Sequence, residues 1–176
     1  MFQRAVLARS VTTDTRPVYL WIDEAQNYIA SSDYEYQSVA RSARAASVYL
    51  TQNISMYYAV LGAGGRDAAN ALMGNFGTKV LHSNGDVPTN QWAADTIGQA
   101  WTTTYNYNAS RNEQGHSMSG GGSDSVQYKI LPSAFTTLSK RNPVEGIVFQ
   151  GGRIWKDTGE TYLKVQFRQE IPTNAK

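Results

Sequence analysis

The sequence of 176 residues contains no cysteine and only two histidines, His82 and His116. Without cysteine the chain forms no disulfide bond and no thiolate metal site. The two histidines lie too far apart in the chain to give the short ligand spacing of a zinc site. We therefore expect no histidine metal cluster, and we expect His82 to be a side chain at the end of a strand.

Long apolar runs are also absent. No stretch approaches the roughly 20 apolar residues that a membrane-spanning helix needs, and the first residues lack the apolar region of a secretory signal peptide. The sequence therefore predicts a cytoplasmic location. The formal net charge of +2 is too small to indicate nucleic-acid binding by itself. The length and the 41% hydrophobic content are typical of one compact domain.

A third absence concerns phosphate binding. P-loop nucleotide hydrolases hold phosphates with a glycine-rich loop that ends in Gly-Lys-Ser or Gly-Lys-Thr, and neither tripeptide occurs in the chain. Residues 62–66 are rich in glycine but contain no lysine, and residues 74–79 carry glycine, threonine and lysine in the wrong order. Neither segment is a phosphate loop.

Five apolar or aromatic residues at positions 18–22 run directly into the adjacent carboxylates of Asp23 and Glu24. A continuous apolar run of this length is typical of an interior strand of a parallel sheet whose two faces are covered by helices. Ligands of such sheets bind beyond the carboxyl ends of the strands. Two acids at this position can hold magnesium and orient an attacking water. The alternative is structural, because carboxylates after a strand also stabilise the first turn of a helix.

A second short strand is predicted beside the first. Residues 33–46 carry apolar side chains at helical spacing, and residues 47–53 form a short apolar strand that ends in polar amide side chains, among them Gln52. A strand–helix–strand unit places its two strands parallel, with their ends on one side. Gln52 is therefore expected beside Asp23. An amide there can position a water or sense a terminal phosphate, and the alternative is a solvated strand end.

Several segments in this order resemble a family of conjugative DNA-transfer ATPases. Residues 16–26, 40–53, 74–80 and 89–94 are similar to the C-terminal half of the TraG/TraD-type coupling proteins of type IV secretion. These proteins are hexameric motors related to RecA-like translocases. The resemblance implies an α/β fold, a partial RecA-like P-loop NTPase with three layers and a mainly parallel sheet, extended by C-terminal antiparallel hairpins.

The resemblance also implies roles for single residues. Asp23 and Glu24 match the family's acidic motif, with Asp23 holding magnesium through water, and Gln52 matches its sensor position. Arg41 and Arg44 are three residues apart and are expected on one helix face. Either is a candidate to reach the phosphate of a neighbouring subunit, and the alternative is that both only solvate the helix.

The complete family domain uses ATP and Mg²⁺. Because the phosphate loop is missing, we expect this chain to be a fragment or truncated relative that is inactive alone, and the alternative for cofactors is none. The alternative function is a non-catalytic module that binds protein or DNA and retains the motor fold. Full-length relatives are tethered to the inner membrane through segments that this sequence does not show.

The missing loop also leads to predictions about partners. In RecA-like sheets the strand with the phosphate loop lies between the sensor strand and the strand that follows it in the sequence. Here the following strand is predicted at residues 77–82. Without the phosphate-loop strand, it would face residues 48–50 of the sensor strand across a gap. Unpaired amides at such a gap cost roughly 1 to 3 kcal/mol each. We expect the two strands to pair directly, or another chain to fill the gap as a strand-exchanged dimer, a ring or a separate N-terminal half. Single-stranded DNA and relaxosome proteins are further partners that the resemblance implies.

The predicted organisation has three parts. Residues 1–101 form the RecA-like half, residues 102–125 a flexible polar loop rich in threonine, asparagine, serine and glycine, and residues 126–176 the C-terminal strands and hairpins. In the loop, Tyr105 and Arg111 are candidates for touching single-stranded DNA, and the alternative is a mobile linker.

Two further expectations concern the second half. Trp92 and Trp101 are expected in the core, with base stacking as the alternative. After a short helix at 132–139, the glycine pair at 151–152 and the turn at 157–160 predict two successive hairpins.

Overall fold

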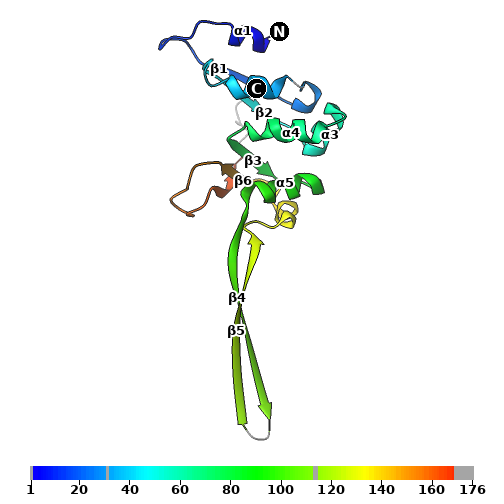
Figure 1. The fold of residues 1–176 in the computed structure, drawn as a ribbon, viewed down its shortest axis with the longest axis vertical. Helices are drawn as coiled ribbons and strands as arrows, with labels where there is room; N and C mark the ends of the chain where they lie inside the picture. Colours follow the sequence, from blue (N-terminus) through cyan, green and yellow to red (C-terminus); the bar gives the residue numbers. More distant parts are fainter. Residues whose placement is uncertain (1, 31, 113–114, 169–176) are drawn as a thin grey trace, which may run out of the picture.

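The computed structural model describes residues 2–30, 32–112 and 115–168, except for the side chains of 108–112 and 115–119. Within these residues the chain is a mixed α/β protein with three small sheets (Figure 1). No described helix is long and apolar enough to cross a membrane. The elements follow in the order α1 (Phe2–Leu7), β1 (Val18–Ile22), η1 (Ala25–Asn27), α2 (Asp33–Val39), β2 (Ala45–Tyr49), α3 (Ile54–Leu61), α4 (Gly65–Gly74), β3 (Thr78–His82), α5 (Val87–Ile97), β4 (Gln99–Asn112), β5 (Gly115–Tyr128), η2 (Pro132–Thr137), β6 (Val144–Gln150) and β7 (Tyr162–Phe167).

The strands β1 and β2 form a parallel pair connected through α2, which confirms the predicted strand–helix–strand unit. Ile22 lies opposite Tyr49, so both carboxyl ends lie at one edge of the pair. The predicted helix over 33–46 is too long, because α2 ends at Val39. The left-handed backbone of Arg44, with a φ of 50°, then turns the chain into β2.

One face of the β1–β2 pair is open to solvent. Ile22 and Tyr49 pack against a core built with η1, α3 and α4. On the other face, Tyr19 and Trp21 are 66% and 68% exposed. The prediction of a strand with both faces covered, and hence of three layers, is therefore wrong for the described residues.

The strand β3 does not join the parallel pair. It pairs antiparallel with β6, which pairs with β7 in a separate three-stranded sheet. The prediction of a mainly parallel sheet is wrong because packing favours this arrangement: Leu81 lies opposite Ile147, and both contact the core that contains Ile97 and Phe135. Over the part of the chain that the structure describes, β2 and β3 do not pair, so the predicted direct closure of the gap does not form.

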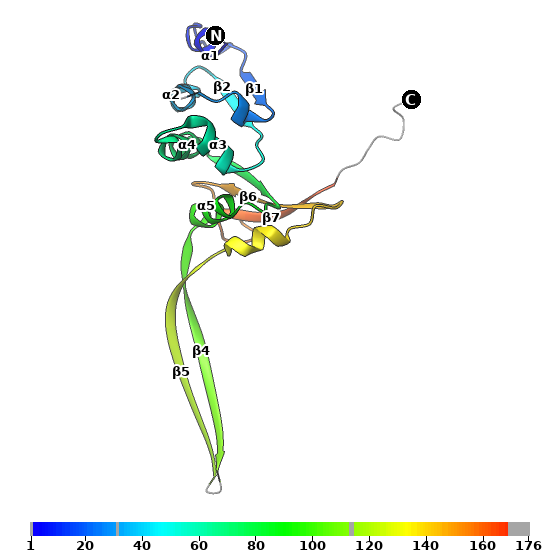
Figure 2. The same ribbon diagram turned by 90° about the vertical axis from the view of Figure 1, so that its right-hand side faces the viewer.

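Residues 102–112 and 115–125 belong to a long β-hairpin, so the prediction of a flexible loop is wrong for these residues. The strands β4 and β5 pair along their whole length, from Gln99 opposite Tyr128 to Asn112 opposite Gly115. The hairpin extends far from the rest of the molecule (Figures 1 and 2). Its threonines and tyrosines favour extended backbone, and this preference outweighs the glycines and serines that suggest disorder.

Over residues 126–168, the structure shows one hairpin where two were predicted. The strands β6 and β7 pair directly, and residues 151–161 connect them without a further strand. This connection folds on itself, since the amide of Trp155 donates to the carbonyl of Glu160 at 2.9 Å and the guanidinium of Arg153 lies 3.9 Å from the centre of the Trp155 ring. The predicted short helix at 132–139 is confirmed as η2.

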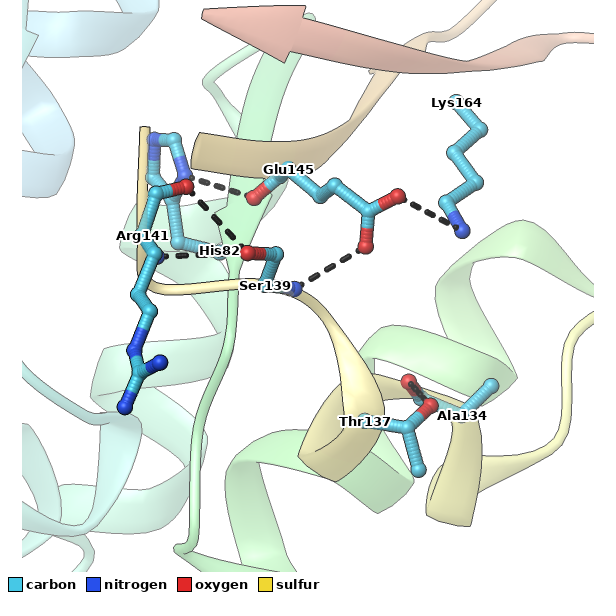
Figure 3. Close-up of polar contacts among 7 residues, drawn as sticks. All are labelled: His82, Ala134, Thr137, Ser139, Arg141, Glu145 and Lys164. Carbon is cyan, nitrogen blue, oxygen red and sulfur yellow. Dashed lines mark hydrogen bonds and ion pairs between the residues drawn. The ribbon is translucent and has the colours of Figure 1, made fainter. Parts of the chain in front are cut away.

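Glu145 on β6 holds the chain that follows η2 (Figure 3). Its carboxylate accepts a hydrogen bond from the amide of Ser139 at 2.9 Å and lies 3.2 Å from the ammonium group of Lys164. Both contacts, that of Ser139 first, lower the pKa of the Glu145 carboxyl below its ordinary value. The carbonyl of Glu145 lies 3.2 Å from Nδ1 of His82, which is an exposed side chain at the end of β3, as predicted.

We predict that Glu145→Gln lowers the melting temperature at pH 7, because the neutral amide loses the ion pair with Lys164. A carboxyl whose pKa is depressed in the folded state stabilises the fold above its ordinary pKa of 4.5, and this contribution is lost as the pH falls through the folded-state pKa. Thermal melts of wild type and variant should therefore differ at pH 7 and converge near pH 3. The exposed Asp157→Asn is the control, and equal melting temperatures of wild type and Glu145→Gln at pH 7 would contradict the prediction.

Candidate functional site at the ends of β1 and β2

The parallel pairing continues for one step beyond the two strands. The amide of Leu50 donates to the carbonyl of Ile22 at 2.9 Å, and the amide of Ala25 donates to the carbonyl of Leu50 at 2.8 Å. These bonds fix the backbone on both sides of Asp23 and Glu24. The hydrogen-bonded pairing therefore includes the first residues that follow the two strands.

The structure brings the predicted acids and amide together at this edge. The side-chain nitrogen of Gln52 donates to both carboxylate oxygens of Glu24, at 3.0 and 3.3 Å. The carboxylate of Asp23 accepts from the amide of Glu24 at 3.0 Å. Glu24 itself has left-handed backbone, with φ and ψ of 48°, which costs a non-glycine residue about 1 to 2 kcal/mol. Strain of this kind persists where the surrounding contacts fix the backbone.

A third side chain, Gln26, completes the support of Glu24. It is 1% exposed. Its side-chain nitrogen donates to the carboxylate of Glu24, and its side-chain oxygen accepts from the hydroxyl of Thr51 at 2.8 Å. Sequence reasoning did not assign a role to Gln26. The available signal was its position two residues after Glu24, where a polar side chain precedes a buried turn.

A second network joins Gln52 to the start of α5. The side-chain nitrogen of Asn84 donates to the backbone carbonyl of Gln52 at 2.7 Å, and its side-chain oxygen accepts from the amide of Asp86 at 2.7 Å. Asp86 caps α5 by accepting from the amide of Thr89 at 3.0 Å, and it accepts from the hydroxyl of Ser55 on α3. The end of β2 is thus connected to the helix that leads into the long hairpin.

Hydrogen bonds at the site favour the ionised forms of the Glu24 and Asp86 carboxyl groups. Hydrogen bonds from Gln52 and then Gln26 lower the pKa of the Glu24 carboxyl below its ordinary value. At Asp86, partial burial raises the pKa, but the hydrogen bonds from Thr89 and Ser55 outweigh it and leave the pKa lowered. A carboxylate held ionised in this way accepts hydrogen bonds from water and is a weak base. Glu24 is therefore suited to orienting a water.

Asp23 has an exposed side chain at this edge. Among the described contacts, its carboxylate accepts one hydrogen bond, from the neighbouring backbone amide of Glu24. Over the described residues there is no group of three or more acids or histidines that could form a complete protein cage. A single carboxylate with open solvent around it fits magnesium, which keeps most of its water ligands.

The two candidate arginines lie away from this edge. Arg44 directly precedes β2 and Arg41 lies in the turn before it, at the opposite end of the strand pair from Glu24. Both are in turns and not on one helix face, because α2 ends before them. The guanidinium of Arg44 donates to the carbonyls of Thr12 and Thr13. Neither arginine reaches the acids within one copy of the chain, and a role toward a neighbouring subunit stays a prediction.

The structure confirms the prediction for one of the two tryptophans and not for the other. Trp92 packs against the core with Ile97, as predicted, whereas Trp101 is 77% exposed on β4, so its prediction as a core residue is wrong. Tyr105 is also exposed on the hairpin. The side chains of Arg111 and His116 lie outside the described residues.

Comparisons with known proteins bear on the family and the fold of the chain. Residues 17–138 match the family model described as the TraM recognition site of TraD and TraG. The chain is similar to the structure of the bacterial conjugative coupling protein TrwBΔN70, with 18% sequence identity and a TM-score of 0.70, and to plasmid coupling protein TrwB in complex with ADP and Mg²⁺, with 18% identity and a TM-score of 0.67. The two matches cover 99% and 98% of this chain but only 37% and 35% of those chains. Comparison with curated proteins gives no match.

We predict that Gln52→Ala raises the pKa of Glu24 toward its ordinary value of 4.5, because the variant removes the main hydrogen bond to the ionised carboxylate. A ¹³C NMR titration of the glutamate carboxyl carbons in both proteins measures this change. Gln37→Ala, on α2, is the matched control and should leave the titration of Glu24 unchanged. An equally low pKa in Gln52→Ala would show that the amide does not hold the acid.

We also predict that Asp86→Ala lowers the free energy of unfolding by about 0.5 to 2 kcal/mol, the usual range for loss of an N-terminal helix cap. Denaturant unfolding followed by circular dichroism measures the change. Asp67→Ala, in the first turn of α4 but with no cap contact, is the control with the same loss of charge. Equal stability losses in the two variants would argue against a specific role of the Asp86 network.

Proposed function

The chain belongs to the TraG/TraD family of conjugative coupling proteins, and from that premise we propose that it supplies the hydrolysis side of an ATP site. The phosphate-binding loop of that site comes from another segment or another chain. The single observation that carries the proposal is the contact of Gln52 with Glu24 at the carboxyl ends of two parallel strands. This is the place where ligands of parallel sheets bind.

The proposed roles follow from the contacts at this edge. Asp23 faces the metal ion through water, and Mg²⁺ would neutralise the charge of the phosphate oxygens when bound. Glu24, held ionised by Gln52 and Gln26, accepts a hydrogen bond from the attacking water and orients it. Gln52 bridges the carboxylate and the network of Asn84, so it is placed to sense the state of the site. Structures of TrwB in complex with ADP and Mg²⁺, with a non-hydrolysable ATP analogue and with a non-hydrolysable GTP analogue support a purine nucleotide as the ligand.

The missing phosphate loop determines the proposed partner. The sequence has no such loop, and the chain spans about a third of the TrwB chains that it matches. A complementing segment would cover the solvent-exposed face at Tyr19 and Trp21. It would also pair with β2 on the side where, in the described residues, β3 does not pair with it. We propose the phosphate-loop half of a coupling protein as this partner, with a ring or dimer of such units as the assembly. The cytoplasmic side of the membrane is the corresponding location.

A second candidate function is recognition without catalysis. It is favoured by one observation, the description of the matching family model as a TraM recognition site. In this case the chain retains the fold of the motor and binds a TraM-like relaxosome protein, or single-stranded DNA, without turning over nucleotide. The two candidates differ in whether the carboxylate of Glu24 matters for activity.

We predict that the chain alone does not hydrolyse ATP, and that hydrolysis appears when it is co-purified with the phosphate-loop half of a relative that is truncated before its own acidic motif. In the reconstituted complex, Glu24→Gln should lower kcat by about 10²- to 10⁴-fold, the usual contribution of a residue that orients or deprotonates the attacking group. A coupled phosphate-release assay measures the rate. Binding of a fluorescent ATP analogue should be retained by the variant.

The control variant is Glu35→Gln, which removes an exposed carboxylate of α2 that does not contact the site. It should leave kcat unchanged. A stable complex that neither binds nor hydrolyses nucleotide would contradict the catalytic proposal and favour recognition. Full activity in Glu24→Gln would contradict the role of this acid even if the complex hydrolyses ATP.

A further inference from the structure

The long β4–β5 hairpin has an aromatic stripe along one face. Alternate residues of β4 point to the same side of the ribbon, and three of them, Trp101, Tyr105 and Tyr107, are 77%, 66% and 75% exposed. We define these three residues as the aromatic stripe. Nothing in the described part of the chain covers it, although a two-stranded ribbon is only marginally stable in water by itself.

Glycines lie opposite the two tyrosines of the stripe. Tyr105 pairs with Gly122 and Tyr107 with Gly120. A Cβ atom at Gly122 would lie 3.5 Å from the ring of Tyr105, and a Cβ atom at Gly120 would lie 3.3 Å from the ring of Tyr107. Each ring therefore lies across the ribbon, over the glycine opposite it. Because the glycines add no side chains on this side of the ribbon, the two rings form its outer surface there, and aromatic rings pack favourably against other aromatic rings.

The stripe has almost no charge. Among the described side chains of the hairpin, residues 99–107 and 120–128, Asp124 is the one charged group, and it accepts a hydrogen bond from the hydroxyl of Thr103 at 2.7 Å. Proteins that stack bases on aromatic rings combine the rings with a positively charged groove for the phosphates. The described part of the hairpin has no basic side chain for the phosphates and carries the carboxylate of Asp124 instead. The charge therefore favours a protein partner and disfavours single-stranded DNA.

We infer that the aromatic stripe is an interaction surface for a second copy of this chain, with the two hairpins packed face to face about a two-fold axis. A second copy presents the same aromatic face, on which Asp124 is the one charged side chain among the described residues, and an isologous interface uses the same patch on both copies. Three largely exposed aromatic side chains from each copy would bury on the order of 1,000 Å² together, which reaches the lower limit of a specific interface. The ribbon projects away from the rest of the molecule (Figure 2), so two hairpins can meet without a clash between the bodies.

Sedimentation velocity of the full chain over a concentration series tests this inference. Wild type is expected to show a monomer–dimer equilibrium, and Tyr105→Ser with Tyr107→Ser should raise the dissociation constant of the dimer by about tenfold or more, as expected for aromatic residues at the centre of an interface. The pair Tyr105→Phe with Tyr107→Phe keeps the rings and should keep the association. The pair Thr104→Ser with Asn106→Ser alters the opposite face and should also leave it unchanged.

A monomer at every concentration would overturn the inference. So would association that the serine variants leave intact, or that the variants of the opposite face weaken equally. A monomeric wild type that binds a single-stranded oligonucleotide through Tyr105 and Tyr107 would overturn it in favour of DNA. None of these outcomes depends on ATP hydrolysis, so failure of this inference is distinct from failure of the proposed function.

A cysteine experiment covers the case in which the serine variants unfold the hairpin. Since the chain has no cysteine, Thr103→Cys places a single thiol on the striped face and Thr104→Cys places one on the opposite face. Under mild oxidation at low protein concentration, we expect a disulfide-linked dimer of Thr103→Cys to form at least about tenfold faster than that of Thr104→Cys, because proximity raises the effective concentration of the thiols. Equal rates would overturn the face-to-face arrangement.

Discussion

The site depends on two backbone hydrogen bonds that extend the parallel pairing of β1 and β2 beyond the last residues of the strands. One joins the amide of Leu50 to the carbonyl of Ile22, and the other joins the amide of Ala25 to the carbonyl of Leu50. Together they position Glu24 and Gln52 side by side. Without them the left-handed backbone of Glu24 would relax, because an unsupported non-glycine residue does not stay in this conformation.

The same bonds determine how the site is connected to the rest of the molecule. Gln52 donates its side chain to Glu24 and offers its carbonyl to Asn84, which holds the capping residue Asp86 of α5. The helix α5 leads through Gly98 into β4. Hydrogen bonds and the chain itself therefore connect the acids to the base of the long hairpin. The two features that distinguish this chain, the acidic edge and the aromatic stripe, lie at the two ends of this connection.

The sequence was informative where local patterns decide the structure. An apolar run followed by Asp23 and Glu24, then a helix and a strand ending in Gln52, was sufficient to predict a parallel pair with its polar residues at one edge. Pairing between distant segments could not be predicted in this way. The pairing of β3 with β6 depends on contacts between residues more than 60 positions apart. The hairpin was not predicted because its glycines and serines are typical of flexible segments and outweighed the threonines and tyrosines of β4 in the interpretation. Gln26 was missed because its burial depends on the turn that η1 forms after β1.

Amide hydrogen exchange of the isolated chain, followed by NMR, shows whether the two backbone hydrogen bonds beyond the strands hold the site. We expect the amides of Leu50 and Ala25 to exchange as slowly as that of Val48, which lies within the β1–β2 pair, because all three belong to one hydrogen-bonded unit. Rapid exchange at Leu50 and Ala25 beside a protected Val48 would contradict this expectation. In that case the pairing would stop at the strand ends, and the acids would not be held in place before a partner binds.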